Sequence, residues 1–223
     1  MQGVTATLDH VVVAARTLDE GRAWCREVLG VDAIGGGQHD GLATHNALLR
    51  LGEATDRCYL EIIATNPDAG EPQFPRWFGL DTIALRQEIE HGPKLAAWVA
   101  RCAGAPDAIE RLAATPGYAA TVVRSASRGD FRWRFAFTPD GERIDGGVLP
   151  HLIQWDVDFH PCDRLPASGV RLSSLLLGAP APEASGELLA RLGFASEGVY
   201  VGQSASPQLV ATLHTAHGIV TLD

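Results

Sequence analysis

An imidazole and a carboxylate stand inside two apolar stretches near the start of the chain. His10 lies within the valine-rich run Leu8–Val13, and Glu61 lies within Tyr59–Ala64. Glutamate is rarely buried unless it is paired or functional. A histidine and a glutamate that project into one cavity can bind a divalent metal through nitrogen and oxygen. They can equally form a buried hydrogen-bonded pair without a metal, and the residues alone leave both alternatives open.

Both apolar runs have the composition of buried strands, so their side chains should alternate between two faces. This alternation places Leu8 and Val12 on the face that carries His10, and Tyr59 on the face that carries Glu61. We therefore expect His10 and Glu61 to project into one cavity, where both are candidate catalytic residues.

The residues between these two strands complete one unit. A helix is predicted to begin after an N-cap at Thr17, with Glu20 as the capping-box partner, and to end at Gly30. Residues 30–42, which contain three consecutive glycines, are predicted to form a turn. Thr44–Leu51 is predicted to be a strand. With Thr44–Leu51 as the third strand and Tyr59–Ala64 as the fourth, the order is strand, helix, strand, strand, strand.

This order, with a histidine in the first strand and a glutamate in the last, resembles the vicinal oxygen chelate superfamily and, more narrowly, its glyoxalase-like branch. The residues that carry the resemblance are Leu8–Val13, Gly35–His39, Thr44–Leu48 and Tyr59–Ala64. The resemblance implies an α+β fold of repeated βαβββ modules, whose mixed, curved sheet encloses a cavity. It also implies one metal ligand from the first strand and one from the last strand of each module.

Related patterns recur along the chain and predict three modules, at residues 1–64, 79–157 and 168–223. In the second, modified module, Leu80–Arg86 is predicted to be the first strand, and helices are predicted over residues 93–103 and 105–114. Two modules can complete one curved sheet. The third must then pack on that unit or contribute to a homodimer contact.

The second module departs from the ligand pattern. Its expected first strand has no histidine, and its last strand offers Gln154 where a glutamate is usual. The resemblance therefore implies His10, Glu61 and Gln154 as the metal ligands, for zinc, manganese or iron. A neutral glutamine carbonyl makes such a site weaker. In the third module, Ser174 stands at the position of His10.

Further side chains are candidates for the wall of a substrate site: His39, Thr44, Asn46, Tyr59, Gln154 and Trp155. Each also has an ordinary alternative, such as a solvated loop histidine at His39 or core packing of the aromatic rings. Arg132 and Arg134 share one strand face and would suit an anionic substrate if that face lined the cavity. His160 is predicted to lie in a loop.

Composition limits the classes of protein. Of 223 residues, 46% are hydrophobic and 20% are charged, as in soluble globular proteins, and no apolar run is long enough for a membrane span. The net charge of −9 disfavours nucleic acid as a partner. The first residues lack a signal-peptide pattern. The four cysteines are widely spaced, with Cys25 and Cys102 in predicted helices, so we expect reduced thiols in a cytoplasmic protein.

Two functions follow from this pattern. By resemblance, the chain is a small-molecule enzyme of the lyase, isomerase or dioxygenase type, in which a metal binds substrate oxygens and Glu61 or a nearby base moves a proton. The alternative is a protein that binds or sequesters a small molecule without chemistry. The missing second-module ligands favour binding, the retained first-module residues favour an enzyme, and the fold does not decide between them.

Overall fold

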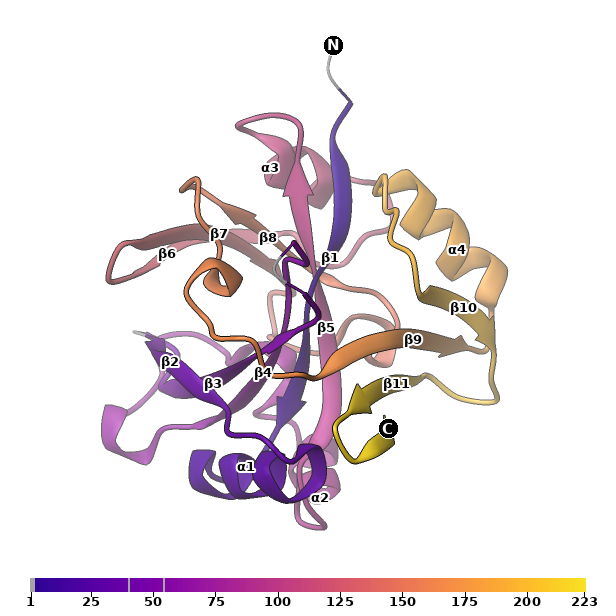
Figure 1. Cartoon of the computed structure of the whole chain (residues 1–223). Helices are drawn as coiled ribbons and strands as arrows, with labels where there is room; N and C mark the ends of the chain where they lie inside the picture. The colour runs from indigo at the N-terminus through magenta and orange to yellow at the C-terminus, as the bar shows by residue number, and fades with distance from the viewer. Residues whose placement is uncertain (1–2, 40, 54) are drawn as a thin grey trace.

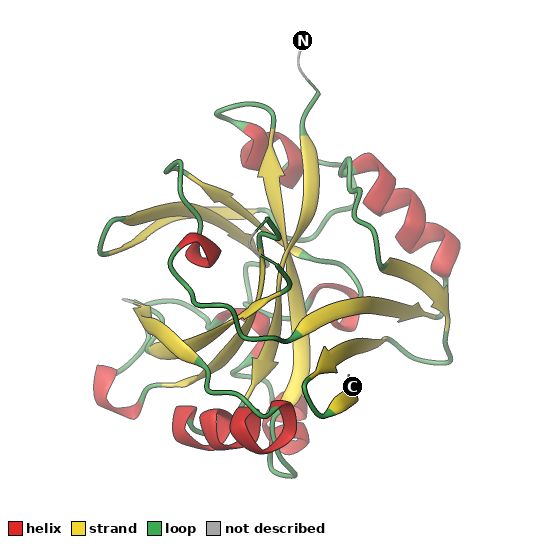
Figure 2. Ribbon diagram, viewed as in Figure 1, coloured by secondary structure: helices red, strands yellow, loops and turns green. Residues whose placement is uncertain are grey.

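A strongly curved eight-stranded sheet is the largest element of the structure, a computed structural model that describes residues 3–39, 41–53 and 55–223 (Figures 1 and 2). Residues 1, 2, 40 and 54 belong to the first predicted module and lie outside the described residues. The predicted α+β class with a mixed, curved sheet is confirmed. The strand order is β2-β3-β4-β1-β5-β8-β7-β6, so two four-stranded halves meet where β1 and β5 pair antiparallel.

The first half follows the predicted order of elements. It contains β1 (Thr5–Ala14), α1 (Leu18–Trp24) with a π-helical turn (Cys25–Leu29), β2 (Ile34–His39), β3 (Thr44–Leu51) and β4 (Cys58–Thr65). The Thr17 hydroxyl accepts a hydrogen bond from the Glu20 backbone N–H and caps α1. Gly30, with φ of 75°, ends the helical segment. The turn predicted at the three glycines is wrong, because all three lie in β2, where the pairing with β3 is irregular.

The second half has the same topology, and its last strand also pairs parallel with its first. It contains β5 (Lys94–Ala103), α3 (Ala108–Ala113), β6 (Val122–Arg128), β7 (Phe131–Phe137) and β8 (His151–Trp155), and α2 (Ile83–Ile89) precedes it. Short 3-10 turns occupy Pro67–Ala69, Trp77–Gly79, Ile144–Gly147 and Pro161–Asp163.

Two sequence predictions for this half are wrong. The strand expected at Leu80–Arg86 is largely helix α2, whose N-cap Thr82 accepts a hydrogen bond from the Leu85 N–H. The helix expected over residues 93–103 is the strand β5, so Cys102 lies in a strand. β5 is buried on both faces and therefore lacks the alternation that marks a half-exposed strand.

The third set of elements forms a separate sheet. It contains β9 (Arg171–Ala179), α4 (Pro182–Arg191), β10 (Val199–Gln203), β11 (Gln208–Thr215) and β12 (Gly218–Leu222), in the sheet order β10-β9-β11-β12. The pairing of strands in this set differs from that in the other two. Its first strand, β9, pairs parallel with its second strand, β10, and not with its last strand, β12. It packs on the large sheet: the Leu8 N–H donates to Ser196 Oγ, and the Ala6 N–H donates to the Gly193 carbonyl.

The two faces of the large sheet carry different cores. One cluster contains Val11 and Val13 together with side chains of the third sheet and of the covering helices. The other, on the concave face, contains Val12 and is dominated by aromatic rings. Within the part of the chain that the structure describes, no helix is long and apolar enough to cross a membrane.

Helix α1 packs on β4 through a glycine. A methyl group at Gly21 would lie 2.3 Å from Ile62 Cγ2 in the core, whereas one at Gly186 in α4 meets no atom within 4 Å. We predict that Gly21→Ala lowers the free energy of unfolding by about 1–3 kcal/mol through overpacking. Gly186→Ala should raise it by about 0.5–1 kcal/mol because alanine favours the helix. Urea unfolding measures both, and equal effects would contradict this packing.

Candidate active site

The concave face of the large sheet carries a cavity made of two adjacent pockets, which we call the inner and the outer chamber. The inner chamber has a volume of about 30 Å³ and the outer chamber about 250 Å³. Four side chains line both chambers: His39, Trp77, Trp133 and Phe135. The inner chamber is also lined by His10, Asn46, Tyr59, Glu61, Arg128 and Trp155. The predicted convergence of His10, Glu61, Asn46 and Tyr59 is thus observed.

A chain of charged side chains lies at the base of the inner chamber. His10 Nδ1 is 2.8 Å from Asp9 Oδ1, and His10 Nε2 is 3.4 Å from Glu61 Oε2. All three side chains are buried. The imidazole of His10 therefore joins two carboxylates, one on each side, and also stacks on the Tyr59 ring with centroids 4.4 Å apart.

A β-bulge explains how adjacent residues of one strand can both take part. Leu8 pairs with Ala100 and His10 pairs with Val99, so Asp9 is an extra residue in β1. Such a residue interrupts the alternation of faces. Leu8 therefore packs with the cluster on the other face, and its predicted place beside His10 is wrong. Sequence periodicity carries no mark of this bulge, and Asp9 was missed for that reason.

Asp9 is fully buried and has further partners from distant segments. Its Oδ2 accepts hydrogen bonds from Trp155 Nε1 at 3.1 Å and from Arg101 at 3.2 Å, and His160 Nε2 lies at 3.1 Å. His160 lies in the loop after β8, as predicted, but it is buried, and it caps the turn that follows it.

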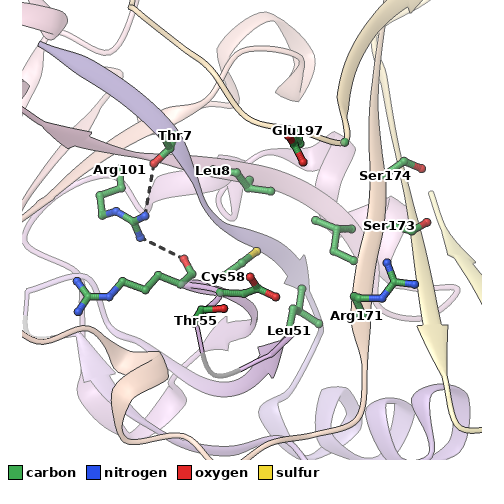
Figure 3. A pocket seen from close by; sticks show the side chains of 15 residues that line it. Thr7, Leu8, Leu51, Thr55, Cys58, Arg101, Arg171, Ser173, Ser174 and Glu197 are labelled. Carbon is green, nitrogen blue, oxygen red and sulfur yellow. Dashed lines mark hydrogen bonds between the residues drawn. The ribbon is translucent and has the colours of Figure 1, made fainter. Parts of the chain in front are cut away.

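Arg101 of β5 reaches Asp9 from the edge of the site, and it pairs across the sheet with Ile153, which faces the cavity. Figure 3 shows Arg101 at the edge of a separate pocket of about 340 Å³ between β1 and β9. There its guanidinium donates to Thr7 Oγ1 and to the Arg57 carbonyl. One arginine therefore contacts both the buried carboxylate and the surface where the third sheet packs.

These contacts set the charge states of His10, Asp9 and Glu61. Burial opposes a charge on His10, but the hydrogen bonds to Asp9 and Glu61 outweigh it and raise the pKa of His10 to about 9. Burial also disfavours ionised Asp9 and Glu61. Hydrogen bonds from His10 and His160 hold the pKa of Asp9 well below its usual range, and those from His10 and Asn46 lower the pKa of Glu61.

Asn46 fixes the orientation of Glu61 and His39. Its Oδ1 accepts hydrogen bonds from the Gly37 N–H at 2.9 Å and from Arg128 at 3.1 Å, so its Nδ2 must face the cavity. This Nδ2 donates to Glu61 Oε1 at 2.5 Å and lies 3.3 Å from His39 Nε2.

His39 is buried at the end of β2, so the alternative of a solvated loop histidine is wrong. Its Nδ1 lies 2.9 Å from Thr44 Oγ1, which brings Thr44 to the edge of the site. Burial lowers the pKa of His39 to about 4, and the ring is neutral at neutral pH. The cavity thus combines a charged histidine with a neutral one.

The second half contributes mainly aromatic and apolar side chains. Trp133 and Phe135 of β7 line the cavity, whereas Arg134 on the other face pairs with Asp156 and Glu110. The arginine face of β7 therefore does not line the cavity. Two arginines of β6, at positions 124 and 128, do so instead.

Gln154 points away from the site, and its predicted convergence with His10 and Glu61 is wrong. Its amide binds the Ile109 N–H at 2.9 Å and the Ala105 carbonyl at 3.0 Å beside α3. Its neighbours Ile153 and Trp155 face the cavity instead. The sequence assignment was one residue out of register, which in a strand reverses the face.

Strand register shows what the second half has in place of metal ligands. Val99 lies directly opposite His10 across the two halves. Glu61 pairs with the residue two positions after His10, and Ile153 pairs with the residue two positions after Val99. Val99 and Ile153 therefore occupy the positions that correspond to His10 and Glu61, and neither can bind a metal.

The remaining donors do not fit a metal centre. His39 Nε2 lies 3.9 Å from Glu61 Oε1, and the amide of Asn46 contacts both groups. Residues 3–39, 41–53 and 55–223 contain no group of three or more side chains arranged to hold a metal ion. The polar groups instead bind one another.

Comparisons with known proteins agree with this fold. The profile of the family described as a glyoxalase-like domain matches residues 8–193. A hypothetical protein from Staphylococcus aureus has a similar structure, with a TM-score of 0.61 over 98% of this chain and 98% of that chain, at 11% sequence identity. None of the curated proteins matches the chain.

Two enzymes are more distant structural matches. A mutant of 4-hydroxymandelate synthase from Streptomyces coelicolor has a TM-score of 0.49 at 16% identity, over 100% of this chain and 63% of that chain. Methylmalonyl-CoA epimerase from Mycobacterium tuberculosis has a TM-score of 0.39 at 19% identity, over 66% and 85%. Because the family profile spans most of its length, the chain belongs to the glyoxalase-like domain family of the vicinal oxygen chelate superfamily.

The raised pKa of His10 makes stability depend on pH. Because the pKa rises from 6.5 in the unfolded chain to about 9 in the folded one, the contribution is complete below pH 6.5 and is lost as pH rises through about 9. We predict that the free energy of unfolding in urea falls over this interval. His10→Gln should flatten the fall, whereas the exposed-site control His91→Gln should leave it unchanged. The same slope in all three proteins would contradict the charge on His10.

Proposed function

We propose that this protein is an enzyme that transfers a proton on a small molecule held in the cavity, as in isomerase or lyase chemistry, with Glu61 as the base and His10 as the acid. The observation that carries the proposal is the position of a buried carboxylate beside a buried imidazole at the base of a cavity with aromatic walls.

Energetics support a chemical role for this pair. Burying two charges carries a desolvation penalty, and well-packed apolar residues in their place are often as stable or more stable. The second half has that replacement at the corresponding positions, where Val99 and Ile153 are buried. Charged groups kept in such a place are candidates for function. The pKa of Glu61 is lowered and that of His10 is raised, which divides the pair into base and acid.

The surrounding residues suit this division of roles. A substrate carbonyl oxygen beside His10 Nε2 would accept its hydrogen bond, and the Glu61 carboxylate would take the proton from the neighbouring carbon. Asp9 binds Nδ1 and keeps Nε2 turned towards the cavity, while Asn46 holds Glu61 in place. Aromatic walls exclude water, which strengthens these interactions. The dioxygenase alternative needs a redox metal, for which the donor set does not fit.

One observation favours the second candidate, a protein that binds a small molecule without chemistry. The inner chamber has a volume of only about 30 Å³. The side-chain groups of Glu61, Asn46 and His39 also have partners already, so a ligand must displace protein–protein contacts to reach them.

Proton exchange distinguishes the two candidates. We expect the protein to catalyse deuterium incorporation next to the carbonyl group of some members of a panel of ketones, aldehydes and 2-oxo acids in D₂O, followed by NMR. Glu61→Gln should lower the rate about 10²- to 10⁴-fold because the general base is lost. Glu27→Gln, an exposed control in the first helical segment, should not change the rate. A chelator should not reduce it either.

The binding alternative predicts a different result. The panel would then contain compounds that bind in the cavity, yet exchange would stay at the uncatalysed rate for the unmutated protein. Exchange that persists in Glu61→Gln would also contradict the role given to Glu61.

A further inference from the structure

Trp77 carries a buried hydrogen-bond donor without an acceptor. The indole is 6% exposed, and its Nε1 has no partner among the described residues. An indole N–H can only donate, and buried donors without partners are rare in native proteins. Trp77 lines both chambers of the cavity, so its ring lies where the aromatic outer chamber meets the polar inner one.

The backbone beside Trp77 is held in an unfavourable conformation. Phe78 has φ of 61° and ψ of 16°, a left-handed conformation that is a genuine outlier for a bulky residue. Such conformations persist where the surroundings enforce them, and they cluster at ligand sites. Here the Gly79 N–H donates to the Gly141 carbonyl, and Arg76 pairs with Asp81. These contacts fix the turn and with it the position of the indole.

Aromatic side chains form much of the wall of the outer chamber, beside the polar side chains of Gln38, Arg124, Ser125 and Ser127. The aromatic residues include Phe74, Trp77, Trp133, Phe135 and Phe137. The Trp77 ring meets Phe135 and Phe137 edge to face, with centroids 4.7 and 6.4 Å away. An aromatic ligand ring would add further contacts of this kind, which saturated rings cannot match.

From these observations we infer the substrate class: a planar aromatic compound with an oxygen acceptor next to the ring. The ring occupies the outer chamber, and the oxygen accepts a hydrogen bond from Trp77 Nε1 at the entrance to the inner chamber. Trp77 is thus a specificity-determining residue. The inference rests on the proposed function only in treating the ligand as the substrate, since the recognition itself involves no reaction.

Three matched probes test the recognition: acetophenone, ethylbenzene, which lacks the oxygen, and cyclohexyl methyl ketone, which lacks the aromatic ring. In protein labelled with ¹⁵N at the indole nitrogens, we expect acetophenone to move the Trp77 N–H proton resonance downfield and ethylbenzene not to. The resonance is assigned by its absence in Trp77→Phe. Acetophenone should also bind more tightly than either other probe, and about three- to tenfold more tightly than ethylbenzene.

Trp77→Phe keeps an aromatic ring and removes the donor. It should abolish the preference for acetophenone over ethylbenzene while the binding of ethylbenzene changes little. Trp24→Phe, on α1 outside the cavity, is the control and should keep the preference. A Trp77 that only fills the core gives a different result. Trp77→Phe then weakens the binding of acetophenone and of ethylbenzene equally, and acetophenone does not shift the Trp77 resonance of the unmutated protein. This result would overturn the inference.

Failure of the inference and failure of the proposed function give different results. Acetophenone contact with Trp77 Nε1, combined with no deuterium exchange for any compound, retains the recognition and rejects the enzyme. Exchange that depends on Glu61, combined with no response of Trp77 to acetophenone, retains the enzyme and rejects this substrate class. Absence of binding by all three probes also rejects it.

Discussion

The buried carboxylate of Asp9 is the constraint on which the site depends. It has no exposed surface, and it accepts hydrogen bonds or ion pairs from His10, Arg101, Trp155 and His160. A buried carboxylate left without partners would strongly destabilise the fold. The partners come from β1, β5, β8 and the segment after β8, so this one group ties both halves of the sheet to the chain that leads to the third sheet. The charge and orientation of His10 are consequences of this arrangement.

The two halves of the large sheet share a topology but differ in chemistry. The first half supplies the carboxylate, amide and imidazole groups of the cavity, from Glu61, Asn46, His10 and His39. The second half supplies aromatic rings and the arginines of β6, with Val99 and Ile153 at the positions that correspond to His10 and Glu61. A symmetric framework thus holds an asymmetric cavity, because the two halves present different side chains at corresponding positions. This asymmetry makes recognition of a small molecule with an apolar body and a polar reacting group physically reasonable.

The sequence predicted the first half well because its strands carry clear patterns. His10 and Glu61 lie inside apolar runs, and alternation along β4 placed Tyr59 and Glu61 on the same face. Prediction failed where tertiary contacts override such patterns. β5 is buried on both faces and has no alternation, so its sequence predicts a helix instead of a strand. The third sheet repeats the order of elements with a different pairing of strands, which sequence periodicity does not encode.

Errors in the site have similarly local causes. The bulge at Asp9 shifts the alternation of β1 by one residue, so periodicity does not place Asp9 in the site. In β8 the alternation is regular, and the residue that faces the cavity is Ile153, one position before the predicted Gln154. His39 and His160 lie beside glycine and proline residues that indicate loops, yet both are buried, His39 beside Asn46 of the next strand and His160 beside the distant Asp9. The role of Trp77 depends on an unsatisfied nitrogen and on the backbone of Phe78, and neither is visible in a sequence.

The charge of His10 tests the account most directly. NMR titration of ¹⁵N-labelled histidine should find the His10 ring doubly protonated at pH 7.5, with a pKa of about 9. Asp9→Asn should lower that pKa towards or below the ordinary value of 6.5, because burial then acts with less opposition. Asp107→Asn, a change at an exposed site, should leave it unaltered. A neutral His10 at pH 7.5 in the unmutated protein, or a pKa unchanged by Asp9→Asn, would contradict the account.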